Sequence, residues 1–482
     1  MRCARFSVIV ACVVTPLLGC ATYKPAPISP AINAAAIDAR SLNSLRLREF
    51  IKAAAASDPE PGPDAQRGSE LPWTLTTLTL AALYYHPDLD IARSKLAEAR
   101  AGVITAAQVP NPSLSFEELS YNTSIATPSP WVVAPAINFL IETFGKREDR
   151  TAQARHWVQA ARDDLATASW QVRRGVRNAL INLWAARRQR TMLRQRLDLE
   201  NQLVMLLEHR LAAGEASALD VARERINRDR ISLAVRNAER GRVEARTELA
   251  AAIGIPVPAL DGIALSFGVL QRPARPKADV ATGALRREAL VDRSDVQSLL
   301  AGYAAAESAL ALQIANQYPN IRLSPGYIYD QGQNKYMLLP AAALPVFNQN
   351  QGPIAEAMAR RAAAAARFTA LQTRIIDQVD GTAASYRAAT QTLDTATALL
   401  TGEENRERRI LRSFGAGAVD RPTLLTAEIE RVVAEQSRFA AMIQQRQALG
   451  ALEDALQHPF FAPTAALPVL QTNPRRPAEP SS

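Results

Sequence analysis

Cysteine and histidine are scarce in this sequence of 482 residues, which has three cysteines and four histidines. Cys3 and Cys12 fall within an expected N-terminal signal, which leaves Cys20 as the one cysteine of the mature chain. A single cysteine forms neither an internal disulfide nor a zinc centre. The histidines are far apart in the chain: His86, His156, His209 and His458. We therefore expect no metal site.

Catalytic motifs are absent as well. The sequence has no nucleophile elbow, no metal-ligand spacing and no phosphate-binding loop. Gly145, Lys146 and Arg147 are not a nucleotide-binding motif, because no glycine-rich loop precedes them. An enzyme is not expected, and no cofactor is expected apart from a covalent lipid.

Long hydrophobic runs are confined to the N-terminus. Arg2 and Arg5 precede an apolar stretch over residues 6–18. This stretch is too short to span a bilayer, and it has the charge pattern of a signal peptide. No later run of eighteen apolar residues follows, so a membrane crossing by the mature chain would have to use strands.

The end of the signal predicts lipidation. Gly19 stands immediately before Cys20, as in bacterial lipoproteins, so we expect residues 1–19 to be removed and Cys20 to be acylated. Several acyl chains anchor a protein stably, which one chain does not. The alternative is an ordinary signal peptide with a chance cysteine. Ala21, where an aspartate would suggest retention in the inner membrane, favours outer-membrane lipid as the anchor site.

The formal net charge of +9 could suggest a nucleic-acid partner. An exported protein rarely meets nucleic acid, however, and the basic residues alternate with acidic ones along expected helices. One example is the segment over residues 223–229, which contains Arg223, Glu224, Arg225, Arg228 and Asp229. A solvated helix surface is the better interpretation, and no nucleic acid is expected.

An internal repeat is present. Three pairs of residues share an offset of 207, namely Asp88 with Asp295, Pro112 with Pro319, and Gly145 with Gly352. Gly214 and Gly417 are offset by 203. Two large copies of one unit are indicated, at 71–270 and 280–457. The Pro- and Ala-rich residues 20–70 are expected to form a lipidated, extended tether, and 458–482 a flexible C-terminal tail.

Each copy is predicted to contain a helix, a strand pair, a very long helix and a further helix. In the first copy the helices are expected at 75–108, 146–213 and 218–253, and the strands at 113–121 and 131–144. In the second copy the helices are expected at 283–317, 352–414 and 422–457, and the strands at 320–329 and 336–347. A polar loop over 330–334 is expected between these last two strands.

The long helices indicate a coiled coil. At 1.5 Å per residue they reach roughly 95 to 100 Å, which no ordinary globular domain accommodates. Positions that step by three and four in them are apolar, in Val172, Val176, Ala179, Leu183 and Ala186, and in Leu425, Ile429, Val432, Gln436, Phe439 and Ile443, where Gln436 is a polar step. By helices alone, a soluble coiled-coil rod or adaptor fits equally well.

The strands decide between these possibilities. Four segments of about nine to thirteen residues, with aromatic residues near several ends, have the length that crosses an outer membrane when tilted. Pro325, Pro340 and Pro345 interrupt the alternation. Four strands are too few to close a membrane barrel, so the barrel has to be completed by further copies of the chain.

Several motifs occur in a characteristic order between residues 71 and 457: Trp73, Ala81-Ala82-Leu83, His86-Pro87-Asp88-Leu89, Val109-Pro110-Asn111-Pro112, Phe144-Gly145-Lys146-Arg147, Arg150, Ala213-Gly214-Glu215-Ala216-Ser217, Leu219-Asp220-Val221, Leu344-Pro345-Val346-Phe347 and Gly352. In this order, behind a lipoprotein signal, the chain resembles the TolC family of outer-membrane factors. It departs from the family pattern at His86, where asparagine is usual, and at Ser294, where the second copy lacks the proline.

The resemblance implies a mainly α fold with a transmembrane β portion: a homotrimer with a twelve-stranded barrel on a coiled-coil α-helical tunnel that extends into the periplasm. It implies an outer-membrane channel of a tripartite efflux system, a passive duct whose partners are a periplasmic adaptor (membrane fusion protein) and an inner-membrane transporter of the resistance-nodulation-division type. A periplasmic coiled-coil adaptor or structural lipoprotein is the alternative. Small molecules, metal ions and proteins all stay open as cargo.

The resemblance also assigns roles to residues. Glu215, Asp220, Asp420 and Arg421 are candidates for a charged closure at the tunnel tip, or else are solvent-exposed cap residues. The helix starts at the junction of barrel and tunnel are assigned to Gly145, Lys146, Arg147 and Gly352.

Overall fold

The computed structural model describes residues 22–56, 72–124, 129–273 and 282–461, and its chain divides into two compact units, 1–41 and 42–482. In the first unit the described part contains helix α2 (Pro30–Asp38). The hydroxyl of Ser29 caps this helix by accepting a hydrogen bond from the amide of Ile32 at 3.5 Å. All further description concerns the second unit.

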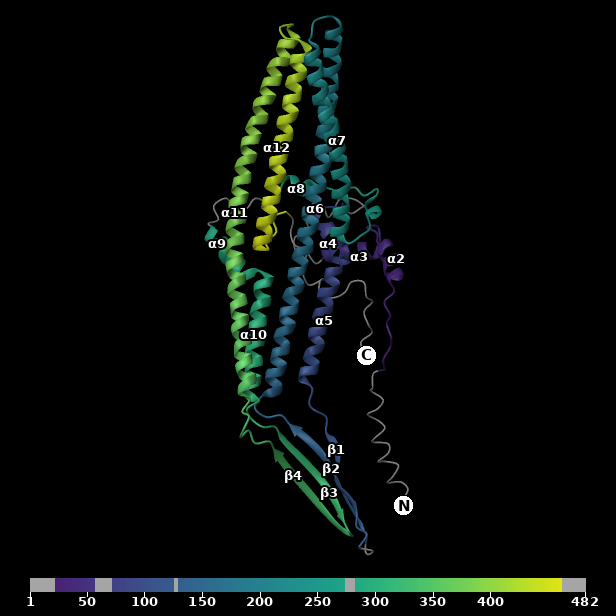
Figure 1. Ribbon diagram of the computed structural model, residues 1–482, viewed down its shortest axis with the longest axis vertical. Coiled ribbons are helices and arrows are strands. Elements are labelled where there is room, and N and C mark those ends of the chain that lie inside the picture. The colour runs from purple at the N-terminus through teal and green to yellow at the C-terminus, as the bar shows by residue number, and fades with distance from the viewer. Residues whose placement is uncertain (1–21, 57–71, 125–128, 274–281, 462–482) are drawn as a thin grey trace. The chain divides into compact units, whose positions relative to one another are not determined.

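The second unit contains the same order of elements twice (Figure 1). The first series is α4 (Leu75–Tyr85), α5 (Pro87–Ala107), β1 (Ser113–Tyr121), β2 (Trp131–Ile141), α6 (Lys146–Ala212) and α7 (Ala218–Ile253). The second is α9 (Thr282–Asp292), α10 (Ser294–Ala315), β3 (Ile321–Asp330), β4 (Gln333–Ala342), α11 (Gln351–Gly415) and α12 (Arg421–Leu456). Helix α3 (Leu45–Ala56) precedes them, and η3 (Val257–Leu260) and α8 (Gly268–Gln271) lie between the two series.

The two very long helices form as the sequence predicts. Helix α6 has 67 residues and α11 has 65, and both are continuous. Gly381 and Gly402 lie within α11 and do not break it, because the helix ladder needs no side chain at either position. The predicted seam of α6 is buried, with Val176, Ala179 and Leu183 fully inaccessible to solvent.

Two helices that the sequence predicted as continuous are each broken in two. The expected helix over 75–108 is interrupted at His86, whose extended backbone ends α4 and caps α5. Pro87 explains this break, because a residue before proline is driven out of the helical region. The expected helix over 283–317 is interrupted at Arg293, which has the same extended backbone without a following proline.

The strands form one antiparallel sheet in the order β1-β2-β3-β4, so β1 and β4 are its edges. The expected polar loop over 330–334 was wrong, since Asp330 pairs directly with Gln333 and leaves a two-residue turn. Gln331 and Gly332 both have positive φ, of 48° and 99°. Two such residues give the turn whose twist matches the flanking strands.

The strand ends also differ from expectation. β2 stops at Ile141 rather than residue 144, because Phe144 and Gly145 adopt positive φ at the turn into α6. β4 covers Gln333–Ala342 rather than 336–347. Pro340 is tolerated because β4 is an edge strand, where a missing amide donor breaks no ladder bond.

The main hydrophobic core lies where α3, α4, α6, α7 and α12 meet, about midway along the long helices (Figure 1). Leu47 and Ile51 of α3 are buried in it, so an extended tether running to residue 70 was wrong. A flexible tail beginning at residue 458 was also wrong at its start, because Phe461 is buried in the same core. The remaining predicted tail, the signal, Cys20 and residues 57–70 of the tether lie outside the described residues.

Among the described residues, α10 is long and apolar enough to cross a membrane by length and composition alone, with a mean hydropathy of 1.2. Helix α10 packs along α6 and α11, and small side chains such as Ala301 and Ala305 are buried in these contacts.

Candidate functional site

The tip of the helical portion is made by two turns, one between α6 and α7 and one between α11 and α12 (Figure 1). Gly214 and Gly417 have φ of 79° and 71°, a conformation that glycine adopts without a Cβ penalty. The amide of Glu215 donates to the carbonyl of Arg210, and that of Ala418 to Ser413. Both helices therefore end in the same hydrogen-bonded cap, and each chain reverses sharply.

Asp420 is the most highly connected of the four predicted tip residues. Its carboxylate caps α12 by accepting from the amide and the hydroxyl of Thr423, at 3.1 and 2.6 Å. It also accepts from Arg210 Nη1 at 2.8 Å. The hydrogen bonds from Thr423, followed by that from Arg210, lower the pKa of Asp420 from 3.8 to about 2. Asp420 therefore links the start of α12 to the end of α6.

The other three tip residues do not join the two helix pairs. Asp220 accepts from the Ser217 hydroxyl at 2.6 Å, within the cap of its own helix α7. Arg421 lies 3.7 Å from Glu428 on its own helix α12. Glu215 is exposed. The partner that sequence analysis missed is Arg210, a cation in the last turn of α6, where it also complements the helix dipole.

Below the tip, α6 and α12 remain in contact through a thin apolar seam. Leu203 of α6 packs with Leu425 and Ile429 of α12 in a small cluster of buried residues. Further from the tip, Trp184 meets Phe439 edge to face, with ring centroids 5.3 Å apart. The seam predicted for α12 is thus the surface that contacts α6.

Deeper in the core, α6 and α12 are joined by a cluster of buried charges, which we name the midpoint ion cluster (Arg173, Arg177, Glu453 and Asp454). Glu453 accepts from Arg173 at 3.1 Å and from Arg177 at 3.0 Å, and its side chain is 0% exposed. Arg177 Nη2 donates to Asp454 at 2.7 Å. Burial alone would lower the pKa of Arg177, but the hydrogen bonds and charges of Asp454 and Glu453 raise it. The guanidinium therefore stays charged.

Further groups complete the midpoint ion cluster. The amides of Phe460 and Phe461 donate to Glu453 Oε2 at 2.7 and 3.1 Å, which holds the chain after α12 against the core. Gly450 makes room for the cluster, since a Cβ there would lie 2.7 Å from Arg177 Nε. No sequence signal pointed to this cluster, because its partners are separated by 276 residues or more.

At the other end of the helices, the predicted helix starts lie next to the sheet. Gly145 is the N-cap of α6 with φ of 72°. Lys146 is buried, and its Nζ donates to the carbonyl of Tyr318 and to Asn320 Oδ1, both at 2.6 Å. Lys146 thereby holds the start of α6 to the segment that enters β3.

The remaining two predicted helix-start residues make fewer contacts. Arg147 is half-exposed and lies 3.8 Å from Glu148. Gly352 is the second residue of α11, and the N-cap of that helix is Asn350, with φ of 62°. Asn350 also donates to the carbonyl of Gln313 at 2.6 Å, so it resembles Gly145 in conformation and position.

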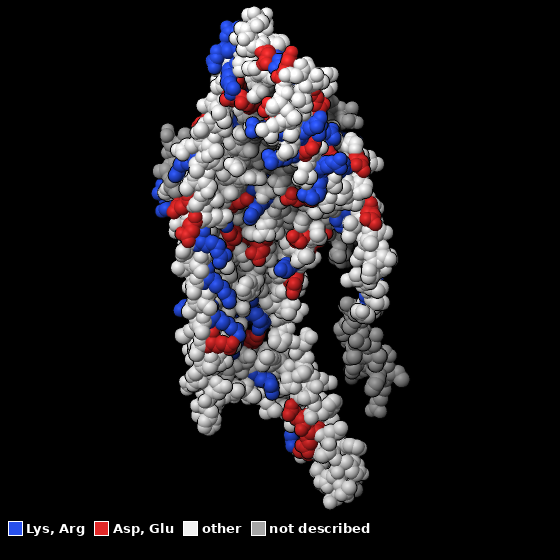
Figure 2. All heavy atoms as spheres, turned by 45° about the horizontal axis from the view of Figure 1, so that its top comes forward, with Lys and Arg blue, Asp and Glu red and all other residues white. Residues whose placement is uncertain are grey.

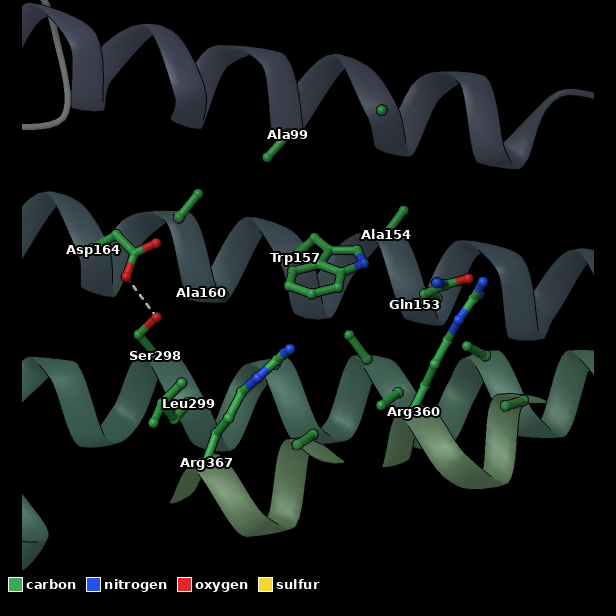
Figure 3. Close-up of a pocket in the computed structure, with 18 of the residues that line it drawn as sticks. Ala99, Gln153, Ala154, Trp157, Ala160, Asp164, Ser298, Leu299, Arg360 and Arg367 are labelled. Carbon is green, nitrogen blue, oxygen red and sulfur yellow. Dashed lines mark hydrogen bonds between the residues drawn. The ribbon is translucent and has the colours of Figure 1, made fainter. Parts of the chain in front are cut away.

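A hollow of about 1060 Å³ lies along the helices between the core and the sheet, and we name it the four-helix groove. Helices α5, α6, α10 and α11 all line it. Figure 3 shows Arg360 and Arg367 of α11 extending across α10 toward α6, where Gln153 and Trp157 lie. The Trp157 side chain is 50% exposed, which is high for an indole.

Charged residues are otherwise interspersed on the surface. Figure 2 shows basic and acidic side chains alternating over the helical part on the face in view, as expected for solvated helices. Within the described ranges, no three His, Cys, Asp or Glu residues lie close enough together to hold a metal ion.

Comparison with known proteins connects this geometry to a family. The family model described as "Outer membrane efflux protein" matches residues 79–255. The pyoverdine export outer membrane protein OpmQ of Pseudomonas aeruginosa is 26% identical over 382 residues, which cover 73% of this chain and 74% of OpmQ. The cobalt-zinc-cadmium resistance protein CzcC of Cupriavidus metallidurans is 24% identical over 364 residues, which cover 74% of this chain and 83% of CzcC.

Solved structures share the fold. The outer membrane protein VceC of Vibrio cholerae superposes with a TM-score of 0.63 at 18% identity, covering 80% of this chain and 97% of VceC. The outer-membrane channel OprN gives a TM-score of 0.65 at 17% identity, covering 92% of this chain and 99% of OprN. The predicted mainly helical fold with a small sheet, resembling TolC-like channels, is therefore confirmed.

Proposed function

We propose that the chain is a member of the outer membrane efflux protein family, and that three copies of it form a closed duct through the outer membrane, with a helical tunnel in the periplasm. The chain is the outer-membrane component of an efflux system. The observation that supports the trimer is the four-stranded sheet, whose edge strands β1 and β4 have no partner strand among the described residues. Four strands cannot close a membrane barrel, whereas three copies supply twelve.

The helical portion supports the tunnel in the same way. Helices α5, α6, α10 and α11 lie side by side in one layer, and in a single copy α5 and α11 are the edges of this layer. Repetition around an axis would cover these edges and close a cylinder continuous with the barrel. The 67 residues of α6 give a tunnel of roughly 100 Å.

The tip is proposed as the periplasmic entrance, closed in part by the Arg210–Asp420 pair. A periplasmic adaptor would dock there and connect the duct to an inner-membrane transporter of the resistance-nodulation-division type. The duct itself is passive. OpmQ is named for pyoverdine export and CzcC for metal resistance, so the family alone leaves the cargo of this chain open.

Lipidation of Cys20 is proposed as a second anchor beside the barrel. Gly19-Cys20 after the apolar run supports it, and acyl chains would hold the N-terminus at the inner leaflet of the outer membrane. Labelled palmitate should enter the wild-type protein and not the Cys20→Ser variant. Label that persists in the variant would place the lipid elsewhere.

The trimeric duct is tested on the full-length protein in isolated outer membranes. We expect heat-modifiable trimers that resist carbonate washing and that conduct in planar bilayers. Monomers released by carbonate would contradict the proposal and would support the alternative, a periplasmic coiled-coil adaptor or structural lipoprotein. Cys20→Ser is a useful variant here, because strands that cross the membrane retain the protein there without a lipid.

A further inference from the structure

We propose that four arginines of α6 and α7 form a binding site for a phosphate group, and we name this site the arginine junction (Arg187, Arg190, Arg242 and Arg246). It lies within a single copy of the chain, where residues 256–271, which connect the two series of elements, contact α6 and α7. The site needs neither a trimer nor conduction, so the inference goes beyond the proposed function and does not depend on it.

The four arginines lie on facing sides of α6 and α7. Arg187 and Arg190 are three residues apart on α6, and Arg242 and Arg246 are four apart on α7. Residues with these spacings share one face of a helix. Glu239 of α7 joins the two faces, because it forms ion pairs with both Arg190 and Arg242.

The connecting segment forms a third side of the arginine junction. The guanidinium of Arg187 lies over the ring of Phe267, with Cζ 5.5 Å from the ring centroid. Asp261 of the same segment pairs with Arg246. Arg187 is therefore held half-buried against an aromatic ring, and its charge has a fixed position.

Positive charge exceeds negative charge at the arginine junction. Within the described ranges, the acidic residues paired with the four arginines are Glu239 and Asp261. Glu239 is shared between two guanidinium groups, and the carboxylate of Asp261 is 71% exposed on the outer side. Four arginines and two carboxylates leave a surplus of two positive charges, so the local charge favours an anion.

Arg187 is the arginine whose charge is left uncompensated. Its guanidinium donates no hydrogen bond to any residue that the structure describes, and Nε of Arg246 also has no acceptor there. Burial, followed by the nearby charges of Arg242 and Arg246, lowers the pKa of Arg187 below its ordinary value. Arginine nevertheless stays protonated at neutral pH. Like charges with unused donors are thus held together, which is unfavourable until an anion accepts from them.

The number and direction of these donors favour phosphate. A guanidinium presents a planar fork of N–H groups that matches two oxygens of a phosphate or carboxylate. A phosphate group has further acceptor oxygens and carries nearly two negative charges, so it can accept from Arg187 and from the α7 arginines together. A carboxylate has two oxygens and one charge, and it would leave part of the surplus in place.

The test follows thermal unfolding of the full-length protein in detergent at about pH 8, where a phosphate group carries nearly two negative charges. Chloride is replaced by the probe at constant ionic strength. We expect inorganic phosphate to raise the melting temperature with a half-maximal effect on the order of 1 mM, and acetate to act as chloride does. Glycerol 1-phosphate separates two sources of the ligand. An effect equal to that of inorganic phosphate assigns the site to phosphate groups on larger molecules, and a weaker effect assigns it to the free ion.

Arg187→Gln is the variant that distinguishes a binding site from a structural contact. In chloride it should melt at the wild-type temperature or above it, because one of the mutually repelling charges is removed. In phosphate its half-maximal concentration should rise about tenfold, because a charge-assisted contact is lost. An arginine that only supports the fold through Phe267 would instead lower the melting temperature in both salts.

Arg409→Gln is the matched control, since Arg409 is an exposed arginine in the last turns of α11, and this variant should keep the full response to phosphate. Equal melting temperatures of the wild-type protein in phosphate, acetate and chloride would overturn the inference, whatever the behaviour of the variants. An unchanged phosphate response in Arg187→Gln would also overturn it. A protein that binds phosphate but forms no conducting trimer would contradict the proposed function alone.

Discussion

Helices α6 and α12 are joined differently at the tip and at their middle. At the tip the polar link is Arg210 with Asp420, whose side chains are 32% and 46% exposed, and the apolar link is a small cluster around Leu203. At the middle, the side chains of Arg177 and Glu453 are 1% and 0% exposed and lie against the main core.

This difference shows where the helix pairs can separate. Exposed ion pairs contribute little, because water and salt compete for both charges. A buried pair that loses one partner leaves an uncompensated charge in the core, which is strongly unfavourable. Motion that parts α6 from α12 at the tip therefore has a low free-energy cost, while the middle acts as the fixed point. Four changes test this contrast, in order of decreasing effect.

Glu453→Ala should be the most damaging change. It leaves the guanidinium groups of Arg173 and Arg177 buried without their shared acceptor, so we expect a loss of about 3–5 kcal/mol in the free energy of unfolding. Thermal and denaturant unfolding of the purified protein measures it. Glu307→Ala, at an exposed position on α10, is the control and should change stability by less than about 0.5 kcal/mol. Similar stabilities of the two variants would contradict the conclusion that α6 and α12 are held together most strongly at their middle.

Gly450→Ala should destabilise by about 1–3 kcal/mol, because its Cβ would lie 2.7 Å from Nε of Arg177, a side chain that Glu453 and Asp454 hold in place. Gly402→Ala makes the same chemical change in α11, where nothing lies within 4 Å. It should stabilise by about 0.5–1 kcal/mol through helix propensity. Opposite signs of the two changes in unfolding free energy are the expected result, and equal signs would argue against close packing at Arg177.

Asp420→Asn should reduce stability by less than about 1 kcal/mol, because the exposed pair with Arg210 is lost while asparagine still caps α12. The expected functional effect is a higher single-channel conductance, since the entrance loses a link between the helix pairs. Asp220→Asn is the matched control, because Asp220 bonds within the cap of its own helix. An equal rise in conductance for both variants would remove Asp420 from the closure.

Acid should weaken the Arg210–Asp420 pair only at low pH. The pKa of Asp420 is lowered from 3.8 to about 2, so its contribution is fully present above pH 3.8 and is lost as the pH falls toward 2. Wild-type conductance should therefore be nearly constant from neutral pH down to about pH 4 and rise only below it. Asp420→Asn should lack this rise. A rise in wild-type conductance near pH 6 would show that a group other than Asp420 controls it.

Much of the local structure follows from the sequence because it depends on neighbouring residues. Gly214 and Gly417 mark the turns because the caps there require positive φ, and Ser217 and Asp420 mark the helix starts because their side chains cap free amides. Helix length follows from the apolar seam, as the buried Val176 and Leu183 illustrate. The helix break at His86 also has a local cause, because the following Pro87 drives His86 out of the helical region. One continuous helix was nevertheless expected there.

Sites formed by distant residues could not be predicted in this way. The midpoint ion cluster joins positions 276 residues apart, and neither Arg177 nor Glu453 differs in sequence from the many exposed charges of the helices. In the sequence, Arg210 is an ordinary basic residue near the end of a helix. Only the fold shows that α12 lies beside it and that Arg210 pairs with Asp420. The two-residue turn at Gln331 also depended on strand register, which the sheet determines.

The sequence by itself thus determined the order of the elements, the two very long helices and the relationship to outer-membrane efflux proteins, since these rest on local periodicity and motif order. Only the tertiary structure decided which charges are buried and paired, and which helices line the four-helix groove. The physical reason is that burial and pairing depend on surfaces brought together from both halves of the chain. In a single sequence, Arg177 and Arg367 are two arginines on long helices, whereas in the fold Arg177 is buried and paired with Glu453 and Asp454, and Arg367 lines the four-helix groove.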